Sequence, residues 1–136
     1  MPSIGQQNLE TVMIDFLGAI RRGDFEAAAW LLDPDVSWQG LREEWLCHGR
    51  EEVIETFRWG LEQRREIDAL EFIRAGDQIV LGARGPSIDA VEDKPLEGQI
   101  LNVFILREGG IVRIDDYRFR KEALAAAGVT EDVGWR

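Results

Sequence analysis

The chain has 136 residues, of which 45% are hydrophobic and 31% are charged, and its formal net charge is −10. These values are typical of one globular domain with an ordinary hydrophobic core, and they exclude a disordered chain. The strong negative charge excludes a nucleic acid as the partner, because a phosphate backbone requires a basic surface.

Cysteine and histidine are almost absent. Cys47 is the single cysteine and His48 the single histidine, so neither an internal disulfide nor a zinc site of the usual kind can form. The opening residues 1–5 lack the basic and apolar regions of a secretion signal, and no apolar run approaches the ~20 residues of a membrane span. We expect a cytoplasmic protein with no metal and no membrane partner.

The first half of the chain has the periodicity of helices. Apolar residues recur at helical spacing, and capping residues and glycines stand where the helices should begin and end. The predicted elements are a helix capped by Asn8 that ends at residues 21–23, a helix at 25–32 capped by Asp24, a short strand at 36–38 and a helix at 50–63.

The second half changes to the periodicity of strands. Short turn signals such as Glu108-Gly109-Gly110 separate apolar or alternating segments, which favours an antiparallel, twisted meander. The predicted strands are residues 67–74, 78–90, 97–107 and 111–120, followed by a helix at 121–127. Residues 129–136 are interpreted as a flexible tail, although Trp135 favours packing.

Helices followed by a curved sheet predict an α+β fold in a single domain spanning residues 1–136. The sheet must wrap around the first and third helices to cover their apolar faces. It then forms a cone that these helices are too few to fill, so we expect an enclosed pocket.

Several local motifs resemble one superfamily. Residues 16–24 run Phe-Leu-Gly-Ala-Ile-Arg-Arg-Gly-Asp, residues 107–111 run Arg-Glu-Gly-Gly-Ile, and Asp116-Tyr117 follows. Together with the order of elements from residue 8 to 128, they resemble the nuclear transport factor 2-like superfamily, in its SnoaL-like and limonene-1,2-epoxide hydrolase-like branch. The resemblance implies a cystatin-like α+β cone with a hydrophobic pocket, and polyketide cyclase, hydrolase or isomerase chemistry.

The epoxide hydrolases of this superfamily imply roles for particular positions. Their base aspartate matches Asp116 and their bridging arginine matches Arg84. Their acid aspartate falls on Pro86, and the tyrosine and asparagine that hold water fall on Trp38 and Gly40. Two of the five groups are therefore present.

Ketosteroid isomerase, another member, matches less well. Its base aspartate falls on Trp38 and its oxyanion tyrosine on Phe16. Its oxyanion acid falls on Asn102, an amide that can still donate a hydrogen bond.

Strand alternation assigns candidate site residues to faces. Arg84 shares a face with Val80 and Gly82, Asn102 shares one with Phe104, and Asp116 shares one with Ile114. The resemblance makes these the concave faces, so three polar side chains should converge in the cone. The predicted catalytic residues are Asp116, Arg84 and Asn102, and the predicted pocket residues are Trp38, His48, Phe16, Phe104 and Ile114.

Structural interpretations stand beside these roles. Arg84 and Asp116 could form an ion pair that only fills space, and Asn102 could satisfy neighbouring backbone groups. His48 precedes the third helix, where a polar side chain often orders a loop. Cys47 has only its sequence neighbour His48 as a pairing histidine, which gives little support to a thiolate nucleophile.

Two classes of function fit the chain. The first is a cofactor-independent enzyme that acts on a small apolar molecule by general acid–base catalysis, with Asp116 as the base. Epoxide opening fits slightly better than cyclisation or double-bond isomerisation because of Arg84. The alternative is a non-catalytic module of the same fold that binds a small ligand or another domain. Under either, a homodimer is expected through apolar residues of the convex face, which are Leu101, Val103, Ile105, Tyr117 and Phe119.

Overall fold

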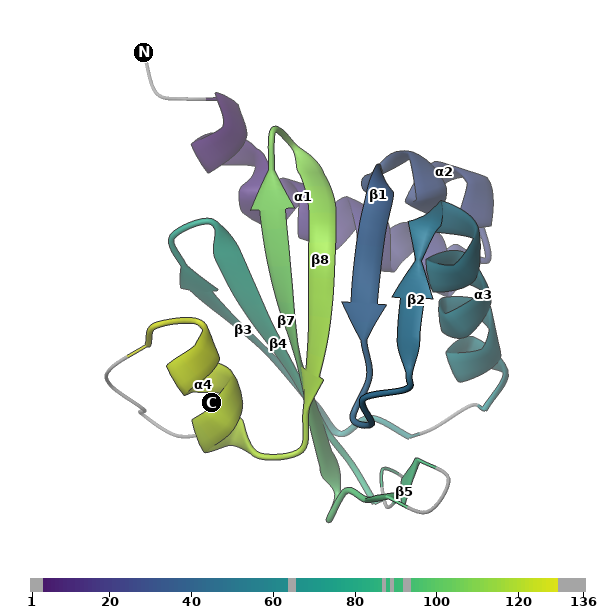
Figure 1. The fold of residues 1–136 in the computed structure, drawn as a ribbon, viewed down its shortest axis with the longest axis vertical. Coiled ribbons are helices and arrows are strands. Elements are labelled where there is room, and N and C mark those ends of the chain that lie inside the picture. The colour runs from purple at the N-terminus through teal and green to yellow at the C-terminus, as the bar shows by residue number, and fades with distance from the viewer. Residues whose placement is uncertain (1–3, 64–65, 87, 89, 92–93, 130–136) are drawn as a thin grey trace.

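The computed structural model describes residues 4–63, 66–86, 88, 90–91 and 94–129 (Figure 1). Four helices occur in this part of the chain: α1 (Ile4–Arg22), α2 (Phe25–Trp30), α3 (Gly49–Glu62) and α4 (Arg120–Ala126). The strands are β1 (Leu32–Gln39), β2 (Leu46–His48), β3 (Ala69–Ala75), β4 (Gln78–Arg84), β5 (Ala90–Val91), β6 (Lys94–Pro95), β7 (Gln99–Arg107) and β8 (Gly110–Tyr117).

Six strands form one curved sheet in the order β2-β1-β8-β7-β4-β3. Neighbouring strands are antiparallel except β1 and β8, which run parallel. The short strands β5 and β6 form a separate hairpin. The predicted α+β class, with N-terminal helices followed by a curved antiparallel meander, is confirmed.

The two faces of the sheet carry different helices. On the concave face, α1, α2 and α3 pack against the sheet around a core that includes Met13, Phe16, Val53 and Phe104. On the convex face, α4 packs against a smaller cluster that includes Leu101. Figure 1 shows this division, with α1 crossing behind the strands and α4 in front of them.

The convex face is therefore partly covered within one chain. Leu101 and Val103 are 0% and 2% exposed beneath α4, so they are not available to a partner. Sequence reasoning placed both in a dimer surface because it did not predict where the last helix would dock. A homodimer stays a prediction, now restricted to Ile105, Tyr117 and Phe119 on this face.

A buried ion pair holds α4 in place. The Arg120 guanidinium donates to the Glu71 carboxylate of β3, and the two side chains are 9% and 8% exposed. Charged side chains are almost never this buried unless they are paired. The pair therefore fixes the last helix to the convex side of the sheet.

Several predicted boundaries differ from the structure. α1 begins at Ile4 rather than after Asn8, whereas Asp24 does cap α2, accepting from the Ala27 backbone N–H at 3.2 Å. β1 starts at Leu32, and the register against β8 shifts between Leu32 and Ser37, around Pro34. A bulge lets a strand continue past a proline, which the sequence pattern alone hides.

Predicted boundaries in the second half of the chain also differ from the structure. β4 stops at Arg84 because Gly85-Pro86 follows, so the predicted strand at 78–90 was too long. α4 ends close to the predicted boundary, and the Val129 backbone N–H bonds to the Leu124 carbonyl at 2.9 Å. The rest of the predicted tail, residues 130–136, lies outside the described residues.

Candidate functional site

A cavity of about 780 Å³ opens on the concave side of the sheet. Its walls come from α1, α3, β1, β2, β4, β7 and β8, together with the loop at residues 40–45 and the connecting residues Ile67 and Ile88. Most of the lining is apolar and includes Phe57, Ile67, Ala83, Ile88 and Ile100. This volume is in the range of pockets that bind small organic molecules.

Asp116 is the polar centre of this cavity. The Trp38 indole N–H donates to Oδ1 of Asp116 at 2.7 Å, and the Asn102 side-chain amide donates to the same oxygen at 2.5 Å. All three residues line the cavity. Two donors from two strands thus converge on one oxygen of a carboxyl on a third strand.

The strand register brings these residues together. Asn102 on β7 lies opposite Asp116 on β8, and Trp38 on β1 lies beside Ile114, two residues earlier on β8. Residues directly opposite each other in a ladder place their side chains on the same face. The alternation within β1, β7 and β8 is therefore sufficient to direct Trp38, Asn102 and Asp116 into the cone.

Burial raises the pKa of the Asp116 carboxyl from 3.8 to about 7. Desolvation is the largest cause, because the protein surrounds the group and disfavours its charge. The hydrogen bonds from Trp38 and Asn102 lower the pKa, and the nearby charge of Asp115 raises it. A carboxyl with a pKa near neutral can both take and return a proton at physiological pH.

The two oxygens of Asp116 are not equivalent. Both hydrogen bonds end on Oδ1, and among the described residues no donor reaches Oδ2. Because the indole N–H and the amide N–H can only donate, Oδ1 must remain the accepting oxygen. The proton of the neutral acid therefore resides on Oδ2, which is the oxygen free to react with a ligand.

The Asn102 amide retains one unused hydrogen-bond donor. An amide nitrogen carries two N–H groups, and one of them is used by Asp116. No other hydrogen bond of this amide occurs among the described residues. A ligand oxygen could accept the second N–H directly beside the reactive oxygen of Asp116.

Arg84 does not join this group, and the prediction that it converges with Asp116 is wrong. In the β4–β7 ladder Leu81, not Val80 or Gly82, lies opposite Asn102. Residues 79, 81 and 83 therefore share the concave face, and Arg84 is exposed on the opposite one. The alternation within β4 was predicted correctly, but its phase relative to β7 was not.

The predicted pocket residues fall into three groups. Trp38 lines the cavity as expected. Phe16, Phe104 and Ile114 lie on the concave side but are 0% exposed in the packed core, so they support the cavity without lining it. His48 is exposed and does not line the cavity, because its neighbour Cys47 takes the inward position opposite Trp38.

Phe57 connects the cavity to this core. Its ring centroid lies 4.5 Å from that of Trp38 and 5.1 Å from that of Phe16, with the second contact edge-on. Phe57 lies in the helix predicted at 50–63, but its contribution to the cavity was not predicted. Its place at the cavity wall fixes the orientation of the Trp38 indole, and through it the hydrogen bond to Asp116.

Cys47 and Thr56 form a second polar contact on the wall. Their Sγ and Oγ1 atoms are 3.3 Å apart, and Thr56 Oγ1 also donates to the Glu52 backbone carbonyl at 2.9 Å. Since the hydroxyl proton is used by Glu52, the thiol of Cys47 is the donor to Thr56. This contact therefore does not provide a base that could activate Cys47 as a nucleophile.

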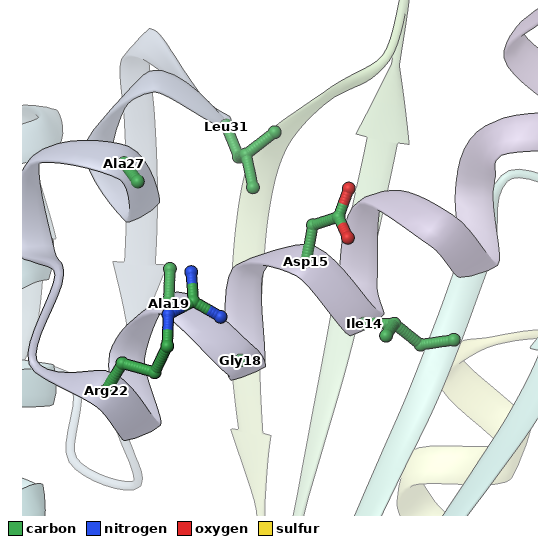
Figure 2. A pocket seen from close by; sticks show the side chains of 7 residues that line it. All are labelled: Ile14, Asp15, Gly18, Ala19, Arg22, Ala27 and Leu31. Carbon is green, nitrogen blue, oxygen red and sulfur yellow. The ribbon is translucent and has the colours of Figure 1, made fainter.

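A second hollow, of about 430 Å³, lies between α1 and α2 (Figure 2). Its charged side chains are Asp15 and Arg22, and its floor includes Gly18 and Ala19. It contains none of the predicted site residues and no strand residue. The larger cavity, which holds the buried carboxyl, is therefore the candidate site.

No helix in the part of the chain that the structure describes is long and apolar enough to span a membrane. No group of three or more histidine, cysteine, aspartate or glutamate side chains is placed to hold a metal ion within the same part of the chain.

Comparison with known proteins rests on structure. The sequence matches no protein-family model and no curated protein sequence. A proposed polyketide cyclase from Xanthomonas campestris superposes with a TM-score of 0.60 at 19% identity, covering 90% of this chain and 98% of that chain. A nuclear transport factor 2-like protein from Cytophaga hutchinsonii also gives 0.60, at 16% identity and covering 80% and 88%.

The chain has the nuclear transport factor 2-like fold. A designed protein from a study of de novo design with diverse pocket structures also superposes, with a TM-score of 0.60, 27% identity and coverage of 80% and 96%. Proteins of this fold place a concave sheet around helices, as found here. The superpositions establish the architecture, and chemistry must be argued from the residues in the cavity.

Proposed function

We propose that the protein is a cofactor-independent enzyme that moves a proton on a small apolar molecule, with Asp116 as its general base and acid. The observation that carries this proposal is the carboxyl with a pKa of about 7 at the apolar cavity, held by two N–H donors on one oxygen. An oriented carboxyl of this pKa is suited to general acid–base catalysis near neutral pH.

The mechanism follows from the two oxygens of Asp116. In its ionised form, Oδ2 removes a proton from a carbon beside a ligand carbonyl group, and the electron pair moves onto the carbonyl oxygen. The second N–H of Asn102 stabilises the resulting oxyanion. The enolate then attacks a second carbonyl carbon of the same molecule, whose oxygen takes the proton from Oδ2, or it is reprotonated by Oδ2 at another carbon.

Cyclisation or isomerisation fits this site better than epoxide hydrolysis. Arg84, which favoured epoxide opening in the sequence, lies on the other face of the sheet. An intramolecular reaction needs no positioned water, because the molecule supplies its own nucleophile. The likeness in fold to a proposed polyketide cyclase supports the same choice.

A non-catalytic ligand-binding role is the second candidate. It is favoured because Asp116 has no second acid beside it among the cavity-lining residues that the structure describes. The two candidates make different demands on Asp116, since binding needs its shape and catalysis needs its proton.

Exchange of ketone α-protons in deuterated water tests the proposal. NMR would follow acetylnaphthalene and other enolisable ketones with the wild-type protein and with Asp116→Asn. We expect exchange that falls at least 100-fold in the variant, because general base catalysis contributes about 10²–10⁴-fold. Ligand binding in the variant should persist. Equal exchange by both proteins rejects the role of Asp116, and binding without exchange favours the binding module.

A further inference from the structure

Charge is distributed unevenly around the cavity. Its described lining contains three carboxyl side chains, Glu44, Glu55 and Asp116, and no lysine, arginine or histidine. Glu44 pairs with Arg42 at 3.5 Å and Glu55 pairs with Arg58 at 3.4 Å, and neither arginine belongs to the lining. These pairs leave the rim near neutral, and Asp116 remains the charge that a bound ligand would meet.

Hydrogen-bond donors beside Asp116 are equally limited, because the other indoles of the lining, Trp45 and Trp59, make no hydrogen bond to it. The Trp38 N–H is used by Asp116, and the Cys47 thiol donates to Thr56. Asn102 retains one amide N–H beside Asp116. One neutral donor matches the single oxygen of a carbonyl group.

A carboxylate or phosphate ligand would not be accommodated. An anion moved from water into an apolar cavity must be paired with a cation or with several donors, or its desolvation is uncompensated. Here it would meet one neutral N–H and, once Asp116 is ionised, a like charge at the same end.

We infer that the cavity selects electrically neutral molecules that present a carbonyl oxygen to Asn102, and that it excludes molecules carrying carboxylate or phosphate groups. This inference rests on the proposed function and narrows its substrate class to uncharged ketones and related carbonyl compounds. Activated acids carried as phosphates or as phosphate-bearing thioesters are then excluded as substrates.

The other titratable groups near Asp116 do not alter this selection. Cys47 on β2 contacts Thr56 on α3, and Glu44 and Glu55 lie at the exposed rim with their arginines. Asp115 on β8 points to the other face, where it pairs with Arg113 at 3.0 Å. No described neighbour therefore supplies the positive charge that an anion would need.

Two matched probes test the inference by calorimetry at pH 8. Acetylnaphthalene is neutral, and naphthoate replaces its acetyl group with a carboxylate of similar shape. We expect naphthoate to bind at least 30-fold more weakly than acetylnaphthalene. A ratio below threefold, or no binding of the neutral probe up to its solubility limit, overturns the inference.

A gain-of-binding variant makes the test independent of folding losses. Leu46 lines the cavity and is 41% exposed, so Leu46→Lys adds a cation to the wall without burying it. The ratio of naphthoate affinity to acetylnaphthalene affinity should rise at least tenfold. Leu46→Gln, the uncharged control, should leave the ratio of the two probes unchanged; an equal gain in both variants contradicts the role of charge.

These measurements separate the inference from the proposed function. Probe binding requires no turnover, so selection of the neutral probe without proton exchange supports the inference and rejects the enzyme. Proton exchange together with tight naphthoate binding supports the enzyme and rejects the selection of neutral molecules.

Discussion

Asn102 and Asp116 are cross-strand partners in the β7–β8 ladder, and the Asn102 amide donates to Oδ1 of Asp116 across 2.5 Å. Trp38 reaches the same oxygen from β1. A carboxyl that is desolvated yet held by two neutral donors is a costly arrangement, because no described cation compensates its charge. Its consequences for stability and for pH dependence can be measured.

Stability should fall as the pH rises through the range in which Asp116 ionises. Its folded pKa, about 7, exceeds the ordinary value of 3.8, so the folded state holds a proton that the unfolded state releases. Stability is therefore lost between about pH 4 and pH 7 and is constant above that range. At pH 8 we expect Asp116→Asn to be more stable than wild type by about 1–3 kcal/mol, less than the full shift implies because the cavity screens the charge.

Urea unfolding of both proteins at pH 4.5 and pH 8 would measure the difference. Comparing the proteins at each pH cancels the contributions of other groups. Asp77→Asn, in the exposed turn between β3 and β4, serves as the control and should keep the wild-type dependence on pH. A difference between Asp116→Asn and wild type that is the same at both pH values would contradict the assignment.

Trp38→Phe should raise the pKa of Asp116 further. The ring is retained against Phe57, but the N–H that favours the ionised carboxylate is lost. A hydrogen bond to a charged group contributes about 1.5–3 kcal/mol, so the midpoint of the pH–activity profile should rise by about one to two pH units. Trp59→Phe changes another cavity tryptophan and should leave the midpoint in place; an unmoved midpoint in Trp38→Phe would show that the indole only packs.

Glu71→Gln should destabilise the fold without affecting the cavity. The substitution leaves the buried Arg120 without its carboxylate, and breaking a buried ion pair costs about 3–5 kcal/mol. Glu55→Gln removes a carboxylate from an exposed pair and should cost about 1 kcal/mol or less. Urea unfolding and probe binding would be measured for both variants. Loss of ligand affinity at pH 8, at temperatures where Glu71→Gln is folded, would contradict the separation of the two faces.

Two glycines form a matched pair with opposite expectations. A Cβ at Gly85 would lie 2.2 Å from the Glu66 carbonyl oxygen, whereas one at Gly60 would meet no atom within 4 Å. Gly85→Ala should destabilise the fold by about 1–3 kcal/mol and weaken probe binding, because the end of β4 must shift beside Ala83. Gly60→Ala, inside α3, should stabilise it by about 0.5–1 kcal/mol. Thermal unfolding of both variants would measure the two changes in stability. Equal changes would be inconsistent with the close contact at Gly85.

The sequence supported the fold more reliably than the site. Asp24, Gly49 and the Glu-Gly-Gly turn mark the ends of helices and strands through local chemistry, so the order of elements could be predicted. Asp116 and Asn102 could be placed on the concave face from strand alternation together with the family resemblance. The short turn alone does not fix their pairing, because the β7–β8 register shifts between Ile105 and Leu106.

The position of Arg84 could not be obtained in the same way. β4 and β7 are joined by a long connection containing the β5–β6 hairpin, which does not fix their register, and a shift of one residue exchanges the two faces. β2 was missed for a different reason, since three residues give too little alternation to recognise a strand. Cys47 and the inward face of this strand were therefore missed with it.

The unequal oxygens of Asp116 also determine the side from which a bound molecule is approached. With Oδ1 occupied by Trp38 and Asn102, the proton leaves toward Oδ2 and returns from Oδ2. Both transfers then take place on the same side of a planar enolate lying in the cavity. Reprotonation would be suprafacial, and a new stereocentre at the receiving carbon would form with a single handedness. The hydrogen bonds of the indole and the amide would thus set the configuration of the product, although neither group transfers the proton.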